Sequence, residues 1–378
     1  MTARRLSQIP LALFGALALA CTQEPSTAPA STDVAPSFSR QSAPGAGRFY
    51  AQHNLVSDGA VPADHVDPAL VNAWGLVASG TSPWWVSDNG TDSSTLYNNG
   101  NTGATVPLRV GVAGAPTGVV FNGGAGFVVR NGSAGGPARF IFATESGTIL
   151  GWNPAVAPNR AVVAVDRSAA GAVYKGLAIA TTVTGGRLYA TNFRGGTVEV
   201  FDTGFHPVPA GFSDPALPAG YAPFGIRNLG GTIYVTYALQ DADAEDDVAG
   251  VGHGFVDAYD LQGNLLRRVA SGGRLNSPWG LALAPSRFGE FSGDLLIGNF
   301  GDGKINAFDP ARTNDAGELQ QRGMLHGAGG QPLAIDGLWA LAFGNGAAAG
   351  PDTTLFFTAG PQDESHGLFG TINAAHRN

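Results

Sequence analysis

Polar side chains recur at one place in six repeated units of this sequence, just after a short apolar segment. The strongest candidates for metal ligands carry carboxylate or amide oxygens, and they are Asp88, Asn192, Asn299 and Asp302. Hard oxygen ligands of this kind suit Ca²⁺, so the pattern predicts a Ca²⁺ site where the four segments end together. The alternative is structural, because Asp and Asn in Gly-rich turns commonly hydrogen-bond their own backbone.

Three further side chains have the chemistry of acid–base catalysts. His253 and His366 each stand directly before the Gly of their repeat, and Glu145 lies in a loop of the same kind. Imidazole can act as a general base or bind a transition metal near neutral pH. Equivalent positions in different repeats need not be in contact, so exposed loop histidines are the other interpretation. The acidic run from Asp241 to Asp247 is expected to be a solvated, mobile loop, since it lacks the spacing of a Ca²⁺-binding loop.

Several classes of function are not favoured by the sequence. It contains no G-x-S-x-G elbow, no H-E-x-x-H, no Walker loop and no paired-cysteine metal motif. Histidines and basic residues are not clustered as a quinone cofactor would require. The net charge is −8 and no basic cluster is present, which argues against nucleic acid as a partner.

The composition indicates which elements must position these side chains. The chain has 56 Gly and 24 Pro, with 44% hydrophobic and only 13% charged residues. Such a composition is typical of many short buried strands joined by tight turns. We therefore predict an all-β protein.

Two short patterns alternate six times through residues 70–373. The first places a small residue among apolar ones, as in Asn72–Leu76, and the second is an alternating segment that ends in an aromatic residue, as in Gly196–Asp202. One more apolar segment, such as Leu188–Ala190, lies between them. Units of about 50 residues with several strands are typical of propeller blades. The patterns predict a six-bladed β-propeller with four-stranded antiparallel blades.

The segment Phe49–Val56 precedes the first unit and has the character of a strand. We expect it to pair with the last blade, because this closes the ring and removes exposed sheet edges. Loops at equivalent positions in the blades then lie on one face around the axis. That face is the natural place for a ligand.

The N-terminus has the layout of a secretion signal. Arg4 and Arg5 precede an apolar run over residues 9–20 that is too short to span a bilayer. Residues 18–21 resemble a bacterial lipobox, in which Cys21, the only cysteine, becomes the lipidated first residue. The alternative is an ordinary signal peptide cut after the small residues.

The predicted organisation has three parts. Residues 1–20 form a lipoprotein-type signal peptide, and residues 21–47, rich in Ser, Thr, Ala, Pro and Gly, form a flexible tether. Residues 48–378 form the propeller. Without a second cysteine an internal disulfide is impossible, so the core and strand closure must hold the fold.

The repeats resemble those of NHL-type six-bladed propellers. More closely, residues 72–76, 277–281 with 298–303, and 335–339 resemble an uncharacterised bacterial family of exported propellers. Some members of that family carry a C-terminal exosortase-sorting tail. Here only Ala374 to Asn378 follow the last repeat, so Cys21 would supply the membrane attachment instead. The resemblance covers residues 49–373 and implies fold and export, with no activity.

Together these patterns predict an exported binding or scaffold module of the cell envelope, facing the periplasm or the cell surface, or otherwise secreted. We expect a monomer held at the membrane only by its lipid. Its partner would be a small molecule, a polysaccharide or an envelope protein bound on the polar loops. The alternative is a Ca²⁺-dependent hydrolase of the lactonase type, with the metal at the propeller axis and an acid or histidine as base. We expect no cofactor other than Ca²⁺.

Overall fold

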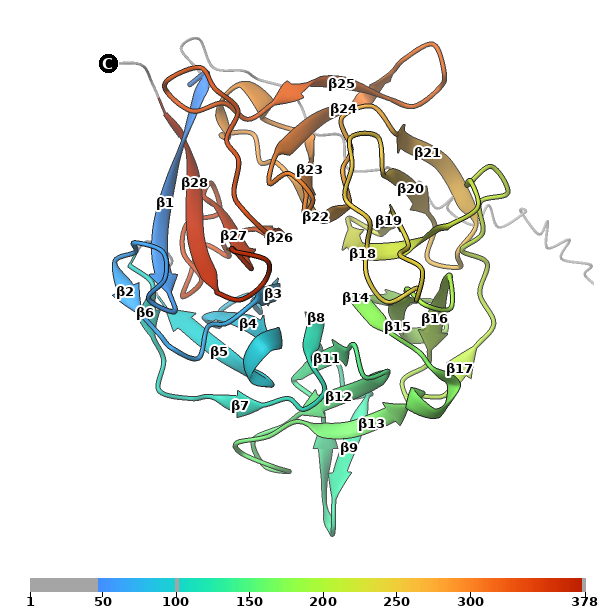
Figure 1. Cartoon of the computed structure of the whole chain (residues 1–378). Coiled ribbons are helices and arrows are strands. Elements are labelled where there is room, and N and C mark those ends of the chain that lie inside the picture. The colour runs from blue at the N-terminus through green and yellow to red at the C-terminus, as the bar shows by residue number, and fades with distance from the viewer. Residues whose placement is uncertain (1–46, 99–101, 376–378) are drawn as a thin grey trace, which may run out of the picture. The chain divides into compact units, whose positions relative to one another are not determined.

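Six antiparallel sheets surround one axis in the computed structural model, which describes residues 47–98 and 102–375 (Figure 1). The predicted six-bladed propeller with four-stranded blades is confirmed. The signal peptide, Cys21 and nearly all of the tether lie outside the described residues. Within those described ranges, no helix combines the length and apolar character needed to cross a membrane.

Each blade runs from an inner strand at the axis to an outer strand at the rim. Blade 1 contains β3 (Ala73–Val77), β4 (Trp84–Asp88), β5 (Ser93–Asn98) and β6 (Ala104–Thr105), with β7 (Val110–Gly111) also on β5. Blade 2 contains β8 (Pro116–Phe121), β11 (Phe140–Thr144), β12 (Thr148–Trp152) and β13 (Val162–Asp166). Blade 3 contains β14 (Tyr174–Thr182), β15 (Gly185–Asn192), β16 (Thr197–Phe201) and β17 (Pro207–Val208).

The second half of the ring repeats this plan. Blade 4 contains β18 (Tyr221–Leu229), β19 (Thr232–Leu239), β20 (Phe255–Tyr259) and β21 (Leu265–Ser271). Blade 5 contains β22 (Pro278–Leu283), β23 (Leu295–Asn299), β24 (Ile305–Thr313) and β25 (Leu319–Met324). Blade 6 contains β26 (Leu338–Phe343), β27 (Leu355–Ala359), β28 (Leu368–Ala375) and β1 (Phe49–Ser57), with β2 (His65–Val66) beside β1.

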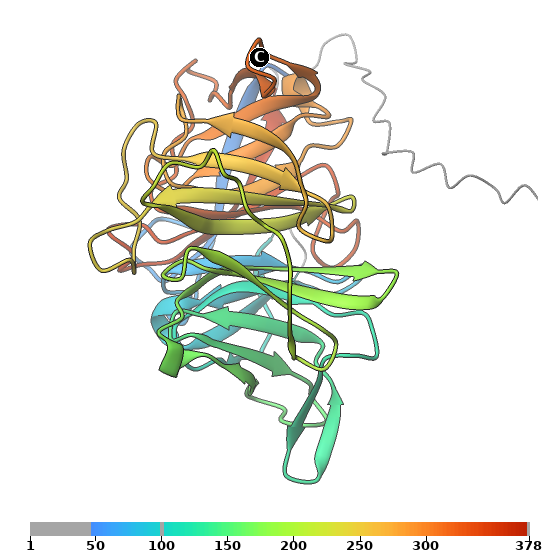
Figure 2. The same ribbon diagram turned by 90° about the vertical axis from the view of Figure 1, so that its right-hand side faces the viewer.

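A few short elements lie outside the blades. The hairpin of β9 (Val128–Asn131) and β10 (Ala134–Pro137) projects from the ring (Figure 2). Three single-turn 3₁₀ helices are η1 (Asn89–Thr91), η2 (Ser168–Ala170) and η3 (Gly289–Phe291).

The ring is closed by strands from the two ends of the described chain. β1 pairs antiparallel with β28, from Phe49 opposite Ala375 to Ser57 opposite Leu368. The buried Tyr50 anchors this closure, because its hydroxyl donates to the carbonyl of Phe288 at 3.0 Å and its ring lies 5.0 Å from that of Phe288. The predicted closing strand is therefore confirmed.

The small residues of the first sequence pattern lie where neighbouring inner strands crowd the axis. A side chain added at Gly225 would overlap the backbone carbonyl of Trp279 in the next blade, and one at Gly75 would overlap that of Thr117. Only a residue without a Cβ allows the blades to approach so closely. Between the blades, aromatic and aliphatic side chains fill the core, as where Trp85 stacks on Phe140 with ring centroids 4.0 Å apart.

Candidate functional site

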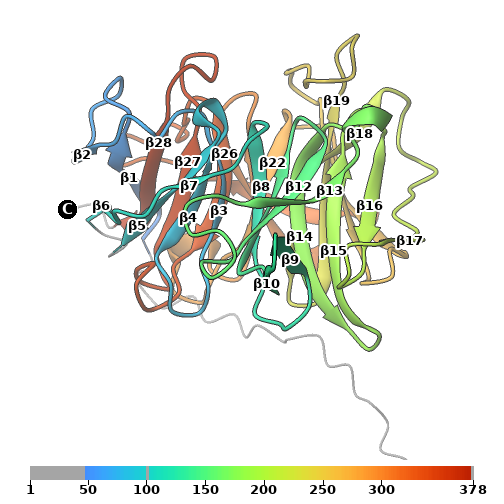
Figure 3. The ribbon, with the colours of Figure 1, turned by 90° about the horizontal axis from the view of Figure 1, so that it is seen from below.

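Strand register places one set of loops together at one end of the axis. The first residues of the inner strands lie opposite the last residues of the middle strands, as Ala73 opposite Asp88 and Tyr174 opposite Asn192. The loops that follow the middle strands therefore share one face. We call this the loop face, and it comprises residues 89–92, 145–147, 193–196, 240–254, 300–304 and 360–367. Figure 3 shows two of these loops, after β19 and β27, rising from the same side of the ring.

Each of the four predicted metal ligands forms a hydrogen bond with a residue of its own blade. Asp88 is fully buried and accepts from the Thr95 hydroxyl at 3.1 Å, within blade 1. Burial raises the pKa of Asp88 well above its usual range. Asn192 donates to Glu199 at 3.0 Å within blade 3. These contacts show the turn and strand chemistry that was the structural alternative for such residues.

Only two of the four predicted ligands are brought together. Asn299 donates to Asp302 at 3.0 Å, and Asp302 also accepts from the Lys304 ammonium at 3.0 Å. Among the residues that the structure describes, no three His, Cys, Asp or Glu side chains form a group able to hold a metal ion. The Ca²⁺ set stays a prediction.

The two candidate histidines have separate partners. The Nδ1 atom of His253 lies 2.8 Å from the carbonyl of Val248, and that of His366 lies 2.6 Å from a carboxylate oxygen of Asp58. Both imidazoles are only partly exposed. The histidines therefore take part in local contacts of their own blades, and their catalytic role stays a prediction.

Glu145, the third candidate, belongs to a cluster centred on a buried lysine. Lys175 of β14 is 1% exposed. Its ammonium donates to Glu145 of blade 2 and, at 2.9 Å, to Asp246 of blade 4. It also lies 5.2 Å from the ring centroid of Trp74 in blade 1, within reach of a cation–π interaction. Four blades thus meet at one ammonium group.

The charge state of Lys175 limits its chemistry. Burial alone would lower its pKa, but the carboxylates of Glu145 and Asp246 outweigh that effect and the pKa is raised. The side chain is therefore a fixed cation at neutral pH. A nucleophilic or basic lysine needs the opposite shift, so this residue serves to hold negative groups in place.

The acidic segment that the sequence predicted as a free loop is anchored by this lysine. Asp241 accepts the backbone N–H groups of Glu245 at 2.9 Å and Asp246 at 3.3 Å. That turn brings the Asp246 carboxylate onto Lys175. A buried ammonium needs a counterion, which explains why the segment folds back onto Lys175.

Two side-chain amides extend the hydrogen-bond network from Glu145 to blade 6. Asn89 donates to Glu145 at 2.8 Å, and Asn72 donates both to Asn89 at 3.2 Å and to Glu364 at 2.6 Å. Asn72 and Glu364 have φ angles of 47° and 63°. Left-handed backbone at non-glycine residues is a strain that clusters at functional sites.

A β-bulge at the start of every inner strand aims side chains at the axis. In each blade the register shifts where one residue interrupts the pairing, and in blades 1, 2, 4 and 6 the small residue after it is skipped as well. Bulges of this kind re-direct side chains. The residues at these bulges are Trp74, Thr117, Lys175, Phe224, Trp279 and Trp339.

Aromatic rings close the axis below the loop face. Trp339 stacks on Trp74 with centroids 3.5 Å apart and on Phe300 with centroids 3.9 Å apart. Phe193, Phe224 and Trp279 complete this group, which we call the aromatic floor. It is tied to the polar network, because the indole N–H of Trp339 donates to Asn72 at 3.0 Å and that of Trp279 donates to the Lys175 carbonyl at 3.2 Å.

Carboxylates outnumber cations at this site. Glu145, Asp246, Asp247 and Glu364 surround Lys175 and interact with it electrostatically. Burial raises the pKa of Glu364, and the nearby Glu145 raises it further. One oxygen of Asp247 is buried without a hydrogen-bond partner among the described residues. The cluster therefore has unsatisfied acceptor capacity and excess negative charge.

Sequence reasoning missed Lys175, although the repeats contain a signal for it. The residue before the small residue of the first pattern is aromatic in four repeats. In the third repeat it is Lys175, a charged residue at a position that otherwise faces the core. The contacts of this lysine come from other blades, and no local pattern predicts them.

The fold and this site define a six-bladed β-propeller whose axis is closed by aromatic rings beneath an acidic loop face. No protein-family model matches the sequence. The chain is 33% identical over 335 residues to "Uncharacterized protein R648" of Acanthamoeba polyphaga mimivirus, covering 84% of this chain and 78% of that protein. It is equally identical over 339 residues to "Uncharacterized protein L690" of the same virus, covering 84% of each. The chain belongs to the family of these proteins.

One solved structure agrees on the fold. A structural genomics protein of unknown function from Bacteroides thetaiotaomicron VPI-5482 matches with a TM-score of 0.51 and 10% identity, over 86% of this chain and 76% of that one. The virginiamycin B lyase of Staphylococcus aureus matches with a TM-score of 0.47 and 11% identity, over 86% of this chain and 99% of that one.

Proposed function

We propose that this protein is a binding module whose loop face takes a small organic cation, such as an amine. One observation carries the proposal: four carboxylates, Glu145, Asp246, Asp247 and Glu364, surround the single ammonium of Lys175. A ligand that brings positive charge would relieve their mutual repulsion, which is strengthened by partial burial.

The architecture of the site supports a ligand of that class. Lys175 shows how an ammonium is received here, between carboxylates and against the Trp74 ring. Phe300 is partly exposed at the edge of the aromatic floor and can receive a second cationic group by the same interaction. The strained turn at Glu364 holds its carboxyl in place before a ligand arrives, which lowers the cost of binding.

Titration calorimetry with spermidine tests the proposal. We expect saturable binding that weakens with added salt, because the carboxylate of Asp246 is exposed and its attraction is screened. The fully acetylated analogue, which has the same length and no charge, should not bind. Equal binding of both compounds would contradict the proposal.

A Ca²⁺-dependent hydrolase is the second candidate, and two observations favour it. One oxygen of Asp247 is buried without a hydrogen-bond partner among the described residues, and burial raises the pKa of Glu364. Asp247 would offer a ligand oxygen, and Glu364 would move a proton. This candidate requires Ca²⁺ to bind and to raise the melting temperature of the protein. A melting temperature that neither Ca²⁺ nor EDTA changes would rule out the hydrolase.

We also propose that the propeller acts outside the cytoplasm as a monomer attached through Cys21. The support is the N-terminal pattern: two arginines, a short apolar run and the lipobox-like residues 18–21. Radiolabelled palmitate should be incorporated when the chain is expressed in a bacterium, and Cys21→Ser should abolish both labelling and membrane association. Retention of label by this variant would rule out lipidation at Cys21.

A further inference from the structure

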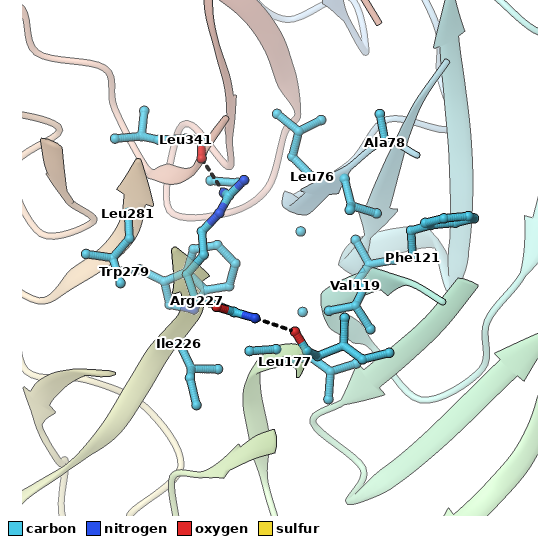
Figure 4. A pocket seen from close by; sticks show the side chains of 18 residues that line it. Leu76, Ala78, Val119, Phe121, Leu177, Ile226, Arg227, Trp279, Leu281 and Leu341 are labelled. Atoms are coloured by element: carbon cyan, nitrogen blue, oxygen red, sulfur yellow. Dashed lines mark hydrogen bonds between the residues drawn. The ribbon is translucent and has the colours of Figure 1, made fainter. Parts of the chain in front are cut away.

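A second, chemically opposite site lies on the other side of the aromatic floor. A cavity of about 260 Å³ follows the axis there, lined by the inner strands of all six blades (Figure 4). Its walls are aliphatic, and each blade contributes such a side chain. In order of the blades these are Leu76, Val119, Leu177, Ile226, Leu281 and Leu341. The lining residues follow the bulges along each inner strand, so the cavity extends away from the loop face.

The cavity is closed at one end and accessible at the other. Trp279 belongs both to the aromatic floor and to the cavity wall, so the floor forms the closed end. Leu76 and Val119 near that end are buried, whereas Ala78 and Phe121 further along the same strands are partly exposed. A ligand would therefore enter from the face opposite to the acidic loops.

Among the described residues that line this cavity, Arg227 alone has a charged side chain. Its guanidinium reaches from β18 across the axis and donates to the Leu341 carbonyl of β26 (Figure 4). Desolvation by burial lowers the pKa of Arg227 to about 10, and no carboxylate opposes that shift. The group therefore stays charged at neutral pH.

Arg227 has more N–H donors than the hydrogen bonds that it forms within the described residues. A guanidinium has five N–H donors, and one bond, to Leu341, is formed within the described residues. No acidic side chain there lies within ion-pair distance of Arg227. The other polar side chain of the wall is occupied, because Asn228 donates to the Ile179 carbonyl at 3.0 Å and accepts from Gly231 at 3.0 Å.

A purely structural role does not explain a charge at this position. A bond to one carbonyl can be made by a neutral amide, and an ion without a partner in apolar surroundings is costly. Arginine, in contrast, is suited to bidentate contact with a carboxylate, phosphate or sulfate group. The remaining donors and the aliphatic wall together describe a ligand with an anionic head and an apolar body.

We propose that the axial cavity binds an amphiphilic carboxylate, with its carboxylate on Arg227 and its hydrocarbon portion along the aliphatic wall. The site is separate from the loop face, and the aromatic floor divides the two. The protein then has a cation-binding site at one end of its axis and an anion-binding site at the other.

Octanoate is the probe that tests this proposal, with octanol and octyltrimethylammonium as neutral and cationic matches. Binding is followed by calorimetry on the whole chain and by tryptophan fluorescence, since Trp279 lines the cavity. We expect octanoate to bind at least tenfold more tightly than octanol, and the cationic match not to bind.

Three cavity variants and one control separate binding from folding. Arg227→Gln can keep the bond to Leu341 and should weaken octanoate binding at least tenfold, while Arg227→Lys should keep most of it. Ala78→Trp narrows the open end and should abolish binding with Arg227 intact. Arg267→Gln, which removes a charge from the outer strand of the same blade, is the matched control and should change nothing. Equal affinity for octanoate and octanol, unchanged binding by both Arg227→Gln and Ala78→Trp, or saturation by sulfate alone would overturn the proposal.

Discussion

The ammonium of Lys175 is held by the carboxylate of Glu145, two side chains that lie 30 positions apart in adjacent blades. Lys175 is placed by a bulge in the inner strand β14, and Glu145 directly follows the middle strand β11. Their pairing therefore depends on how the blades pack, and it connects the stability of the ring to the electrostatics of the loop face.

Replacing Lys175 with Met should destabilise the protein by about 3 kcal/mol, because it leaves the carboxylates of Glu145 and Asp246 facing each other without their buried partner. Urea unfolding measures the loss. Lys304→Met, which breaks a partly exposed pair with Asp302, should cost under about 1 kcal/mol. Similar losses in the two variants would show that the Lys175 cluster is an ordinary surface network.

Replacing Gly225 with Ala should destabilise the ring by about 2 kcal/mol or more, because the new Cβ would overlap the Trp279 carbonyl of the next blade. The comparison is with Gly80→Ala, where a Cβ meets no atom within 4 Å. Thermal unfolding of both variants checks the difference. A Gly225→Ala protein as stable as the Gly80→Ala protein would mean that the inner strands are not closely packed.

Removing residues 47–57 together with the preceding segment should convert a monomer into aggregates, because the loss of β1 exposes the edge of β28. Light scattering after size-exclusion chromatography measures the change. A protein that lacks only residues 1–46 keeps β1 and should remain monomeric. Aggregation of both, or of neither, would contradict closure by β1.

The pH dependence of stability should reveal Glu364. Burial raises the pKa of this carboxyl in the folded protein above the ordinary glutamate pKa of 4.5, so the folded state binds the proton more tightly than the unfolded state. Its contribution to stability is then present at low pH and is lost as pH rises from the ordinary pKa through the folded pKa. Subtracting the stability profile of Glu364→Gln from that of the wild type should leave this fall. A flat difference, or one that rises with pH, would contradict the raised pKa.

The architecture was predictable because it repeats. Glycine in the first pattern marks a crowded inner strand, and Gly75 and Gly225 do lie against the next blade. The closing strand was predictable as well, since Phe49–Val56 had strand character and no unit of its own. Such features are local in sequence, and the sixfold repetition makes each one visible.

The site was less accessible to sequence reasoning because its contacts run between blades. Asp88 and Asn192 were chosen for their position after a strand, yet both bond within their own blades. Glu145 was found, but its partner Lys175 became visible only through the bulge of β14 and the turn that brings in Asp246. No sequence pattern singled out Arg227, since a lone arginine in a strand is usually exposed.

Calorimetry of spermidine with two charge-matched variants measures whether the acidic loop face receives a cation. Asp246→Asn removes a carboxylate that contacts Lys175, whereas Asp243→Asn removes one from the exposed part of the same loop. We predict at least tenfold weaker binding for Asp246→Asn and wild-type affinity for Asp243→Asn. Equal affinities in both variants would contradict it.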